Sequence, residues 1–271
     1  MFCGCMRNLI MTDKLSGFPT VYYISLKESV NRREFMAKQL DAHGIKHHAF
    51  LVDRYSEIKD SLDVRIYPEA AKPLLTPLNV GCSVSQIQIM RHWYENTNEN
   101  YTIFCDDDAN FNSINYWTFT WQEFVETLPP DWNIVQLIRM DDIIERYGVD
   151  IRLNRAVYWG TARLMTRESV GLLLSILTNA DGSYNLIAGG GKHLPGVENI
   201  LFHNCPGFYN FPLLTEFNDE NMKSTGLRYI EEGDENYWRG RDRQTFYNYV
   251  IEKRWEVMGK YLNIREAMVL S

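Results

Sequence analysis

Residues 21–53 read VYYISLKESVNRREFMAKQLDAHGIKHHAFLVD, which sets out a strand, a helix and a second strand. Apolar runs rich in β-forming residues occupy 21–26 and 47–52, and each predicts a buried strand. Between them, Asn31-Arg-Arg-Glu34 has the cap-x-x-Glu spacing of a helix start, and Gly44 is typical of the residue just past a helix end. The stretch therefore predicts a β-α-β unit.

The alternation of strands and helices continues along the chain. We expect strands over 101–105, 132–138, 156–165 and 207–214, helices over 84–95, 116–128 and from the capping residue Thr166 onward, and a loop region over 54–80. Such alternation predicts a sheet with parallel segments and with helices on both faces. The expected fold class is α/β, with a Rossmann-type mixed sheet. A domain over 19–227 would follow a lead-in at 1–18 and precede a C-terminal helical extension at 228–271.

Composition narrows the function classes. Hydrophobic residues make up 45% of the 271 residues and charged residues 23%, as in ordinary globular proteins. The net charge of −7 argues against nucleic acid held through its phosphates. Five cysteines, an odd number, favour a reducing compartment, and the sequence shows no apolar run long enough for a transmembrane helix. We therefore expect a soluble cytoplasmic protein.

Three carboxylates, Asp106, Asp107 and Asp108, directly follow the strand predicted over 101–105. In α/β folds ligands bind at the carboxyl ends of the strands. Adjacent carboxylates repel one another and are costly to desolvate, and a hard cation such as Mn²⁺ or Mg²⁺ offsets that cost. In an extended segment, Asp106 and Asp108 would point the same way and share one ion, with Asp107 turned toward a ribose hydroxyl or a backbone amine. A solvated acidic turn is the alternative.

A cation held by such a D-x-D pattern can neutralise a diphosphate, which is the leaving group when a nucleotide-activated sugar is transferred. Asp53, at the end of the second strand, is placed to accept hydrogen bonds from the base or the ribose. Arg32 and Arg33 lie in the first turn of the first helix, where one of them could reach the diphosphate. For at least one of the two, a surface position is the competing interpretation.

Eight short segments, which follow one another in a fixed order between about residues 19 and 225, together form a recognisable pattern. They are Ile24–Arg33, Phe50–Asp53, Gly81–Gln86, Ile103–Asp108, Trp132–Leu137, Gly160–Val170, Pro195–Glu198 and Phe208–Pro212. In this order they resemble glycosyltransferase family 25, which includes bacterial lipopolysaccharide galactosyltransferases and collagen galactosyltransferase domains. The sequence departs from that pattern at Ser25, where asparagine is usual, at Gln86, where histidine is usual, and at Arg163, where tyrosine is usual.

The resemblance implies a GT-A-type fold, a UDP-sugar donor (often UDP-galactose or UDP-glucose), Mn²⁺ and inversion at the anomeric carbon. The acceptor would be a hydroxyl of a glycan, a lipopolysaccharide-type molecule or a protein. Inversion needs one general base, for which Glu198 is the candidate and Asp142 or Asp141 the fallback. The metal ligands would be Asp106, Asp108 and a late histidine, His203 or His193. The donor-binding candidates are Ser25, Leu26, Arg32, Arg33, Asp53, Ser85, Gln86 and Asp107.

Three alternatives stay open at this point. A nucleotidyltransferase would also place carboxylates on a metal–nucleotide complex, but the chain has no G-x-x-x-x-G-K phosphate loop. A catalytically degenerate member would bind nucleotide sugars or glycans without turnover, and the departures from the family pattern are its main support. An interaction protein would use the aromatic C-terminal helix, and deletion of 228–271 would separate it from the other two.

Overall fold

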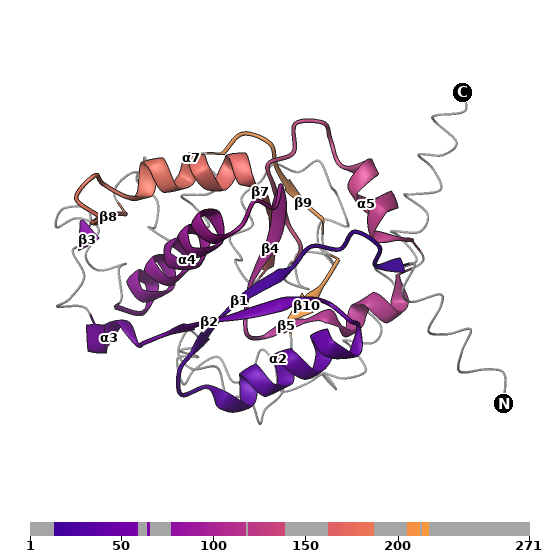
Figure 1. Ribbon diagram of the computed structural model, residues 1–271, viewed down its shortest axis with the longest axis horizontal. Coiled ribbons are helices and arrows are strands. Elements are labelled where there is room, and N and C mark those ends of the chain that lie inside the picture. The colour runs from indigo at the N-terminus through magenta and orange to yellow at the C-terminus, as the bar shows by residue number, and fades with distance from the viewer. Residues whose placement is uncertain are drawn as a thin grey trace, which may run out of the picture.

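The computed structural model describes residues 14–58, 64–65, 77–117, 119–138, 162–186, 205–211 and 213–216. Their main feature is a six-stranded mixed sheet in the order β2-β1-β4-β7-β6-β9, flanked by helices (Figure 1). The elements in chain order are β1 Val21–Leu26, α2 Val30–Ala42, β2 His47–Val52, α3 Tyr55–Ile58, β3 Val64–Arg65, α4 Pro77–Asn96, β4 Tyr101–Asp106, β5 Ala109–Asn110, the 3₁₀ helix η3 Phe111–Tyr116, α5 Trp121–Thr127, β6 Ile134–Gln136, β7 Ala162–Thr166, α7 Arg167–Leu177, β8 Tyr184–Asn185, β9 Phe208–Asn210 and β10 Thr215–Glu216.

Strand direction decides which ends of the sheet carry the site. β1 runs parallel to β2 and to β4, so the carboxyl ends of these three strands meet at one edge. β7 runs antiparallel to β4 and β6, and β6 is parallel to β9. The expected α/β class with a mixed sheet is confirmed, and the parallel part of the sheet is the β-α-β unit together with β4.

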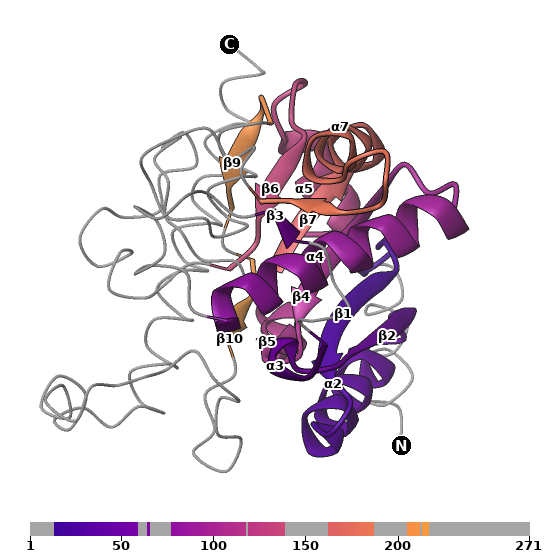
Figure 2. The same ribbon diagram turned by 90° about the vertical axis from the view of Figure 1, so that its left-hand side faces the viewer.

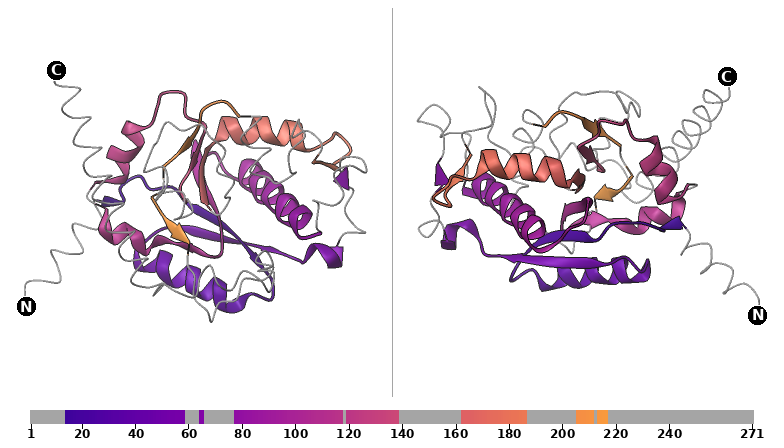
Figure 3. Two further views of the ribbon diagram at one scale, coloured as in Figure 1. Left: turned by 180° about the vertical axis from the view of Figure 1, so that it is seen from behind. Right: turned by 45° about the horizontal axis from the view of Figure 1, so that its top comes forward.

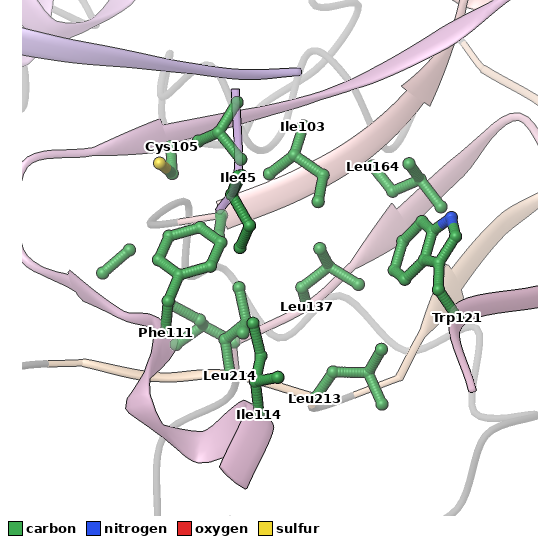
Figure 4. Close-up of a cluster of buried hydrophobic side chains, with 14 of the residues drawn as sticks. Ile45, Ile103, Cys105, Phe111, Ile114, Trp121, Leu137, Leu164, Leu213 and Leu214 are labelled. Atoms are coloured by element: carbon green, nitrogen blue, oxygen red, sulfur yellow. The ribbon is translucent and has the colours of Figure 1, made fainter. Parts of the chain in front are cut away.

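The helices cover both faces of the sheet. α4 and α7 pack on one face, with the strands behind them in Figure 2. α2, η3 and α5 pack on the other, and Figure 3 (right) shows α2 on the side of β1 and β2 away from α4. Successive side chains of β1 point to opposite faces of the sheet, so the strand contributes to both cores. Val21 and Tyr23 belong to one core, and Tyr22 belongs to the other. Trp121 and Leu164 both belong to the first core (Figure 4).

The first half of the predicted element pattern holds closely, since β1 and β2 have the expected bounds. α2 begins slightly earlier than predicted, at Val30, with Ser29 as its N-cap, and Gly44 with φ of 66° follows its end. α4 begins at Pro77 instead of Val84, because proline with its fixed φ suits the first helical position. The expected loop over 54–80 therefore includes the short α3 and β3 and the start of α4.

The helix predicted over 116–128 is wrong in its first half. A 3₁₀ helix ends at Tyr116, and α5 begins only after Thr120. Thr120 and Glu123 form a capping box, in which each side chain bonds to the other residue's backbone N–H, and this fixes the start of α5. The expected cap at Thr166 is confirmed: its side chain accepts a hydrogen bond from the Ser169 N–H.

Two further expectations are corrected at the end of the described chain. The strand predicted over 207–214 is divided, with β9 in the main sheet and β10 paired antiparallel to β5. β7 begins at Ala162 within the described residues. Most of the lead-in, from residue 1 to 13, and the extension 228–271 lie outside the described residues. None of the helices described is both long enough and apolar enough to span a membrane.

Candidate active site

The acidic triplet lies where β1, β2 and β4 end. Asp106 is the last residue of β4 and pairs with Ile24 of β1, so the carboxyl end of β1 lies beside it. Asp107 and Asp108 form the turn between β4 and β5. Three residues separate β1 from α2, and the first turn of α2 contains no acidic residue. The N-terminus of α2 lies at the same edge of the sheet as the carboxylates, since Arg32 of its first turn contacts two of them. The partial positive charge of a helix N-terminus stabilises negatively charged side chains placed there.

Arg32, in the first turn of α2, bridges two of the three carboxylates. Its Nη2 atom lies 2.5 Å from Asp107 Oδ1 and 2.9 Å from Asp108 Oδ2. The Arg32 side chain is 11% exposed and that of Asp108 is 26% exposed. This pair of contacts offsets part of the repulsion between the two neighbouring carboxylates.

Asp107 is the most buried member of the triplet. It is buried, and the Ser25 hydroxyl donates a 2.6 Å hydrogen bond to its Oδ2 atom. Burial raises the pKa of the Asp107 carboxyl above its usual value, while the Arg32 charge and the Ser25 hydrogen bond oppose that shift. Asp107 therefore joins the ends of β1 and β4 and the first turn of α2.

The arrangement differs from the extended D-x-D segment assumed from the sequence. The chain turns after Asp106, so Asp107 and Asp108 share one guanidinium, and Asp106 Oδ1 instead accepts a 3.0 Å hydrogen bond from Gln86 Nε2 of α4. Within the described ranges, no three Asp, Glu, His or Cys side chains are grouped so as to hold a metal ion. An ion bound to these carboxylates would need further ligands to complete its coordination shell, such as phosphate oxygens or water.

Arg33 holds the end of β1. Its Nη1 atom donates to the Leu26 carbonyl oxygen at 2.5 Å, and its Nη2 atom donates to the Lys27 carbonyl oxygen at 2.9 Å. Beside it, Lys27 Nζ lies 2.8 Å from Asp53 Oδ2, and both side chains are substantially exposed. The Asp53 carboxylate is thus accessible on the rim of the site.

An open groove of about 410 Å³ adjoins Asp53. Its lining comes from β2, α3 and α4 and includes Phe50, Ile58, Gln88 and His92. The groove is lined by apolar side chains such as Phe50 and Ile58 and by hydrogen-bonding ones such as Gln88 and His92. Such a combination suits a planar, partly polar group.

The segment Gly81–Gln86 lies inside α4, and only its last residue reaches the triplet. Ser85 Oγ donates to the Gly81 carbonyl oxygen at 2.8 Å, which is a bond within the helix. A Cβ atom on Gly81 would lie 2.7 Å from the Cβ of Tyr55, so glycine here allows α3 to approach α4. Gln86 is buried and fixes the orientation of Asp106.

The predicted base and histidine ligands cannot be placed in this geometry. Glu198, Asp142, Asp141, His203 and His193 all lie outside the described residues. The structure therefore brings together Ser25, Leu26, Arg32, Arg33, Gln86 and the triplet, with Asp53 at the rim and Ser85 turned into its own helix. Sequence reasoning named these residues but missed their mutual contacts, because these join segments far apart in the chain.

Comparison with known families bears on this cluster. Residues 18–133 match the model described as glycosyltransferase family 25 (LPS biosynthesis protein). That match supports a glycosyltransferase. The matched range contains the whole triplet and its partners Ser25, Arg32 and Gln86, so the family signal and the side-chain cluster coincide. No curated protein matches the chain.

Solved structures give distant likenesses. The chain is similar to A197 from STIV at 14% identity and a TM-score of 0.36, over 74% of this chain and 87% of that one. The inositol-1-phosphate CTP transferase from T. maritima is similar at 10% identity and a TM-score of 0.33, over 80% and 77%. Mouse xyloside xylosyltransferase 1, in its apo form, is similar at 12% identity and a TM-score of 0.31, over 70% and 72%.

Proposed function

We propose that this glycosyltransferase moves a hexose, galactose or glucose, from a UDP-sugar to a hydroxyl of a glycan or other acceptor. Transfer would be metal-assisted and would invert the anomeric carbon. The observation that carries the proposal is the acidic triplet at the carboxyl end of β4, beside the first turn of α2, inside the range that matches the family. The association of this family with lipopolysaccharide biosynthesis supports a glycan-type acceptor.

The charge at the triplet fits a divalent ion. Asp107 and Asp108 contact the Arg32 guanidinium, while Asp106 accepts a hydrogen bond from the neutral Gln86 amide. The three carboxylates and this one guanidinium together carry two formal negative charges, which a divalent cation would balance. Mg²⁺ and Mn²⁺ are commonly bound through one or two carboxylates, with water and substrate phosphates filling the other positions. Asp106 and Asp108 are the carboxylates we assign to the ion, with His203 as a further candidate ligand. Bound there, the ion would supply Lewis-acid stabilisation of the departing diphosphate.

The other residues of the site bind and orient. Asp107 is committed to Ser25 and Arg32, so we assign it a positioning role instead of the donor contact expected from the sequence. Asp53, exposed beside the groove, is the candidate acceptor of hydrogen bonds from the base or ribose. The base that takes the proton from the acceptor hydroxyl would be Glu198, with Asp142 as the fallback.

Two of the departures from the family pattern within the site, Ser25 and Gln86, favour an active enzyme over a degenerate binding protein. Ser25 stands where asparagine is usual and donates to Asp107, while Gln86 stands where histidine is usual and donates to Asp106. Each replacement keeps a hydrogen-bond donor directed at the triplet. Both donors hold the triplet in place, which supports a site that still functions.

Replacement of Glu198 by glutamine removes the proposed base and keeps the side-chain shape. We expect turnover to fall by about 10²–10⁴-fold, the usual contribution of a general base, while donor affinity changes little. Single-turnover kinetics and calorimetry with UDP would separate the two effects. Turnover retained in Glu198→Gln would move the base to Asp142, and the same substitution there would be the next variant.

Nucleotide binding tests the proposal before an acceptor is known. Titration calorimetry would compare UDP, GDP and CDP, each with Mn²⁺ and with a chelator. We expect UDP to bind with Mn²⁺ present and to lose most of its affinity in the chelator. Binding of none of the three nucleotides, or binding unaffected by the chelator, would contradict the proposed donor and ion.

A further inference from the structure

Arg32 makes an unusual use of its guanidinium. A single atom, Nη2, contacts both Asp107 and Asp108, whereas the Nε atom is buried and has no hydrogen-bond partner among the described residues. A planar guanidinium can present a fork of donors to one carboxylate, so this pose leaves donor capacity unused. A buried N–H without a partner also carries a desolvation cost.

The cationic nitrogen lies between two carboxylates, where positive charge is most favourable. With no other cation present, it offsets part of the repulsion between Asp107 and Asp108. A divalent ion bound at Asp108 would place two further positive charges near the same nitrogen. The guanidinium and the ion therefore compete for the Asp108 carboxylate.

We propose that Arg32 is a positioning residue that couples ion binding to donor binding: it holds Asp108 in the ion-free protein and turns to the donor diphosphate when the ion takes Asp108. The inference rests on the proposed function, because it assumes an ion at the triplet and a diphosphate donor. Asp107 makes the exchange possible, since Ser25 fixes it independently and it retains Arg32 after Asp108 is given up. The released donors, Nε among them, would then bond to phosphate oxygens.

Two consequences follow for binding. In the absence of nucleotide, Arg32 weakens ion affinity by competition and by charge repulsion. In the presence of a diphosphate, Arg32 gains new acceptors, so nucleotide and ion each increase the affinity for the other, and by the same factor. This coupling through Arg32 would favour binding of the ion and the donor together.

The test measures Mn²⁺ binding by electron paramagnetic resonance of the free ion, with the full chain and no nucleotide. Arg32→Gln removes the charge and should bind Mn²⁺ about tenfold more tightly than wild type. Arg32→Lys keeps the charge and should stay within about threefold of wild type. Arg33→Gln removes the neighbouring charge, which contacts no carboxylate of the triplet: its partners are the Leu26 and Lys27 carbonyl oxygens and, at 3.5 Å, the Ser25 hydroxyl. Its Mn²⁺ affinity should also stay within about threefold of wild type.

Addition of UDP provides the second readout. In wild type we expect UDP to raise Mn²⁺ affinity by about 5–150-fold, and in Arg32→Gln most of that coupling should be lost. If Arg32→Gln does not fold, the side-chain ¹⁵Nε–H resonance of Arg32, assigned through Arg32→Lys, should shift in wild type on addition of Mg²⁺ and again on addition of UDP.

Several results would overturn the inference. If Arg32→Gln binds Mn²⁺ as tightly as wild type or more weakly, Arg32 does not compete with the ion for Asp108. If Arg33→Gln raises Mn²⁺ affinity as much as Arg32→Gln does, the effect comes from the loss of any nearby positive charge and not from Arg32 in particular. An Arg32 resonance that does not shift on addition of Mg²⁺ would show that the guanidinium does not move. In each of these cases wild type still binds Mn²⁺ and the proposed function stands. Absence of Mn²⁺ binding in wild type, with and without UDP, would overturn both the inference and the metal-assisted function.

Discussion

Asp108→Asn should lower donor turnover by about 10²–10³-fold or more, the scale of losing one electrostatic contact to a developing charge, while the fold survives. Asparagine keeps the shape of the side chain and removes the negative charge that would hold the ion. Asp108 lies in a turn and its side chain is 26% exposed, so the substitution leaves the core unchanged. Release of nucleotide diphosphate in the presence of Mn²⁺ is the measurement, with circular dichroism as the check of folding.

Asp41→Asn is the matched control for that variant. Asp41 lies in α2, its side chain is 73% exposed, and its Oδ1 atom lies 3.1 Å from His47 Nε2, away from the triplet. The same chemical change there should leave turnover within about twofold of wild type, because the carboxylate is screened by solvent. An Asp108→Asn rate equal to wild type at saturating Mn²⁺ would rule out Asp108 as a ligand.

Gly207→Ala should destabilise the fold more than any other single methyl addition considered. Gly207 has φ of 71°, and a Cβ atom built on it would lie 1.9 Å from the carbonyl oxygen of Asp131. Its own carbonyl oxygen accepts hydrogen bonds from the backbone N–H groups of Asn133 and Ile134, which brings β9 into line beside β6. The left-handed backbone costs about 1–2 kcal/mol for alanine and the clash about 1–3 kcal/mol more, so we expect the free energy of unfolding to fall by about 2–5 kcal/mol.

Gly182→Ala separates the two causes. Gly182 has φ of 84°, but no heavy atom lies within 4 Å of its added Cβ. It should lose only the backbone term, about 1–2 kcal/mol, in urea denaturation followed by circular dichroism. Equal losses in the two variants would show that the backbone near Asp131 relaxes without cost, and that the close approach at Gly207 does not constrain β9.

Local patterns predicted those parts of the fold that local physics decides. The apolar runs of β1 and β2 and the cap at Thr166 appear as expected, since burial and capping depend on a few neighbouring residues. The start of α5 was also readable, because Thr120 and Glu123 have capping-box spacing, but the helical appearance of the residues before them concealed it. The prediction for this helix therefore failed because it did not use the capping-box spacing that the sequence contains.

The candidate site was predictable in composition but not in its contacts. The triplet's place at a strand end followed from the α/β pattern, Arg32 was predicted from its place in the first turn of a helix, and the family resemblance supplied Gln86. Their partners depend on the register of β1 against β4 and on the packing of α4, which join residues more than twelve positions apart and leave no periodic trace in the sequence. The assumption of an extended segment failed at Asp108 because the chain turns where β4 ends.

The most direct test of the central claim is donor turnover by the wild-type protein. A panel of UDP-, GDP- and CDP-sugars would be incubated with Mn²⁺ or with chelator, and the released nucleotide quantified against Asp108→Asn. The account predicts Mn²⁺-dependent release of UDP from one UDP-hexose, abolished by chelator and by Asp108→Asn. Release that is unaffected by chelator or by Asp108→Asn, or no release from any donor together with no UDP binding in the presence of Mn²⁺, would contradict it.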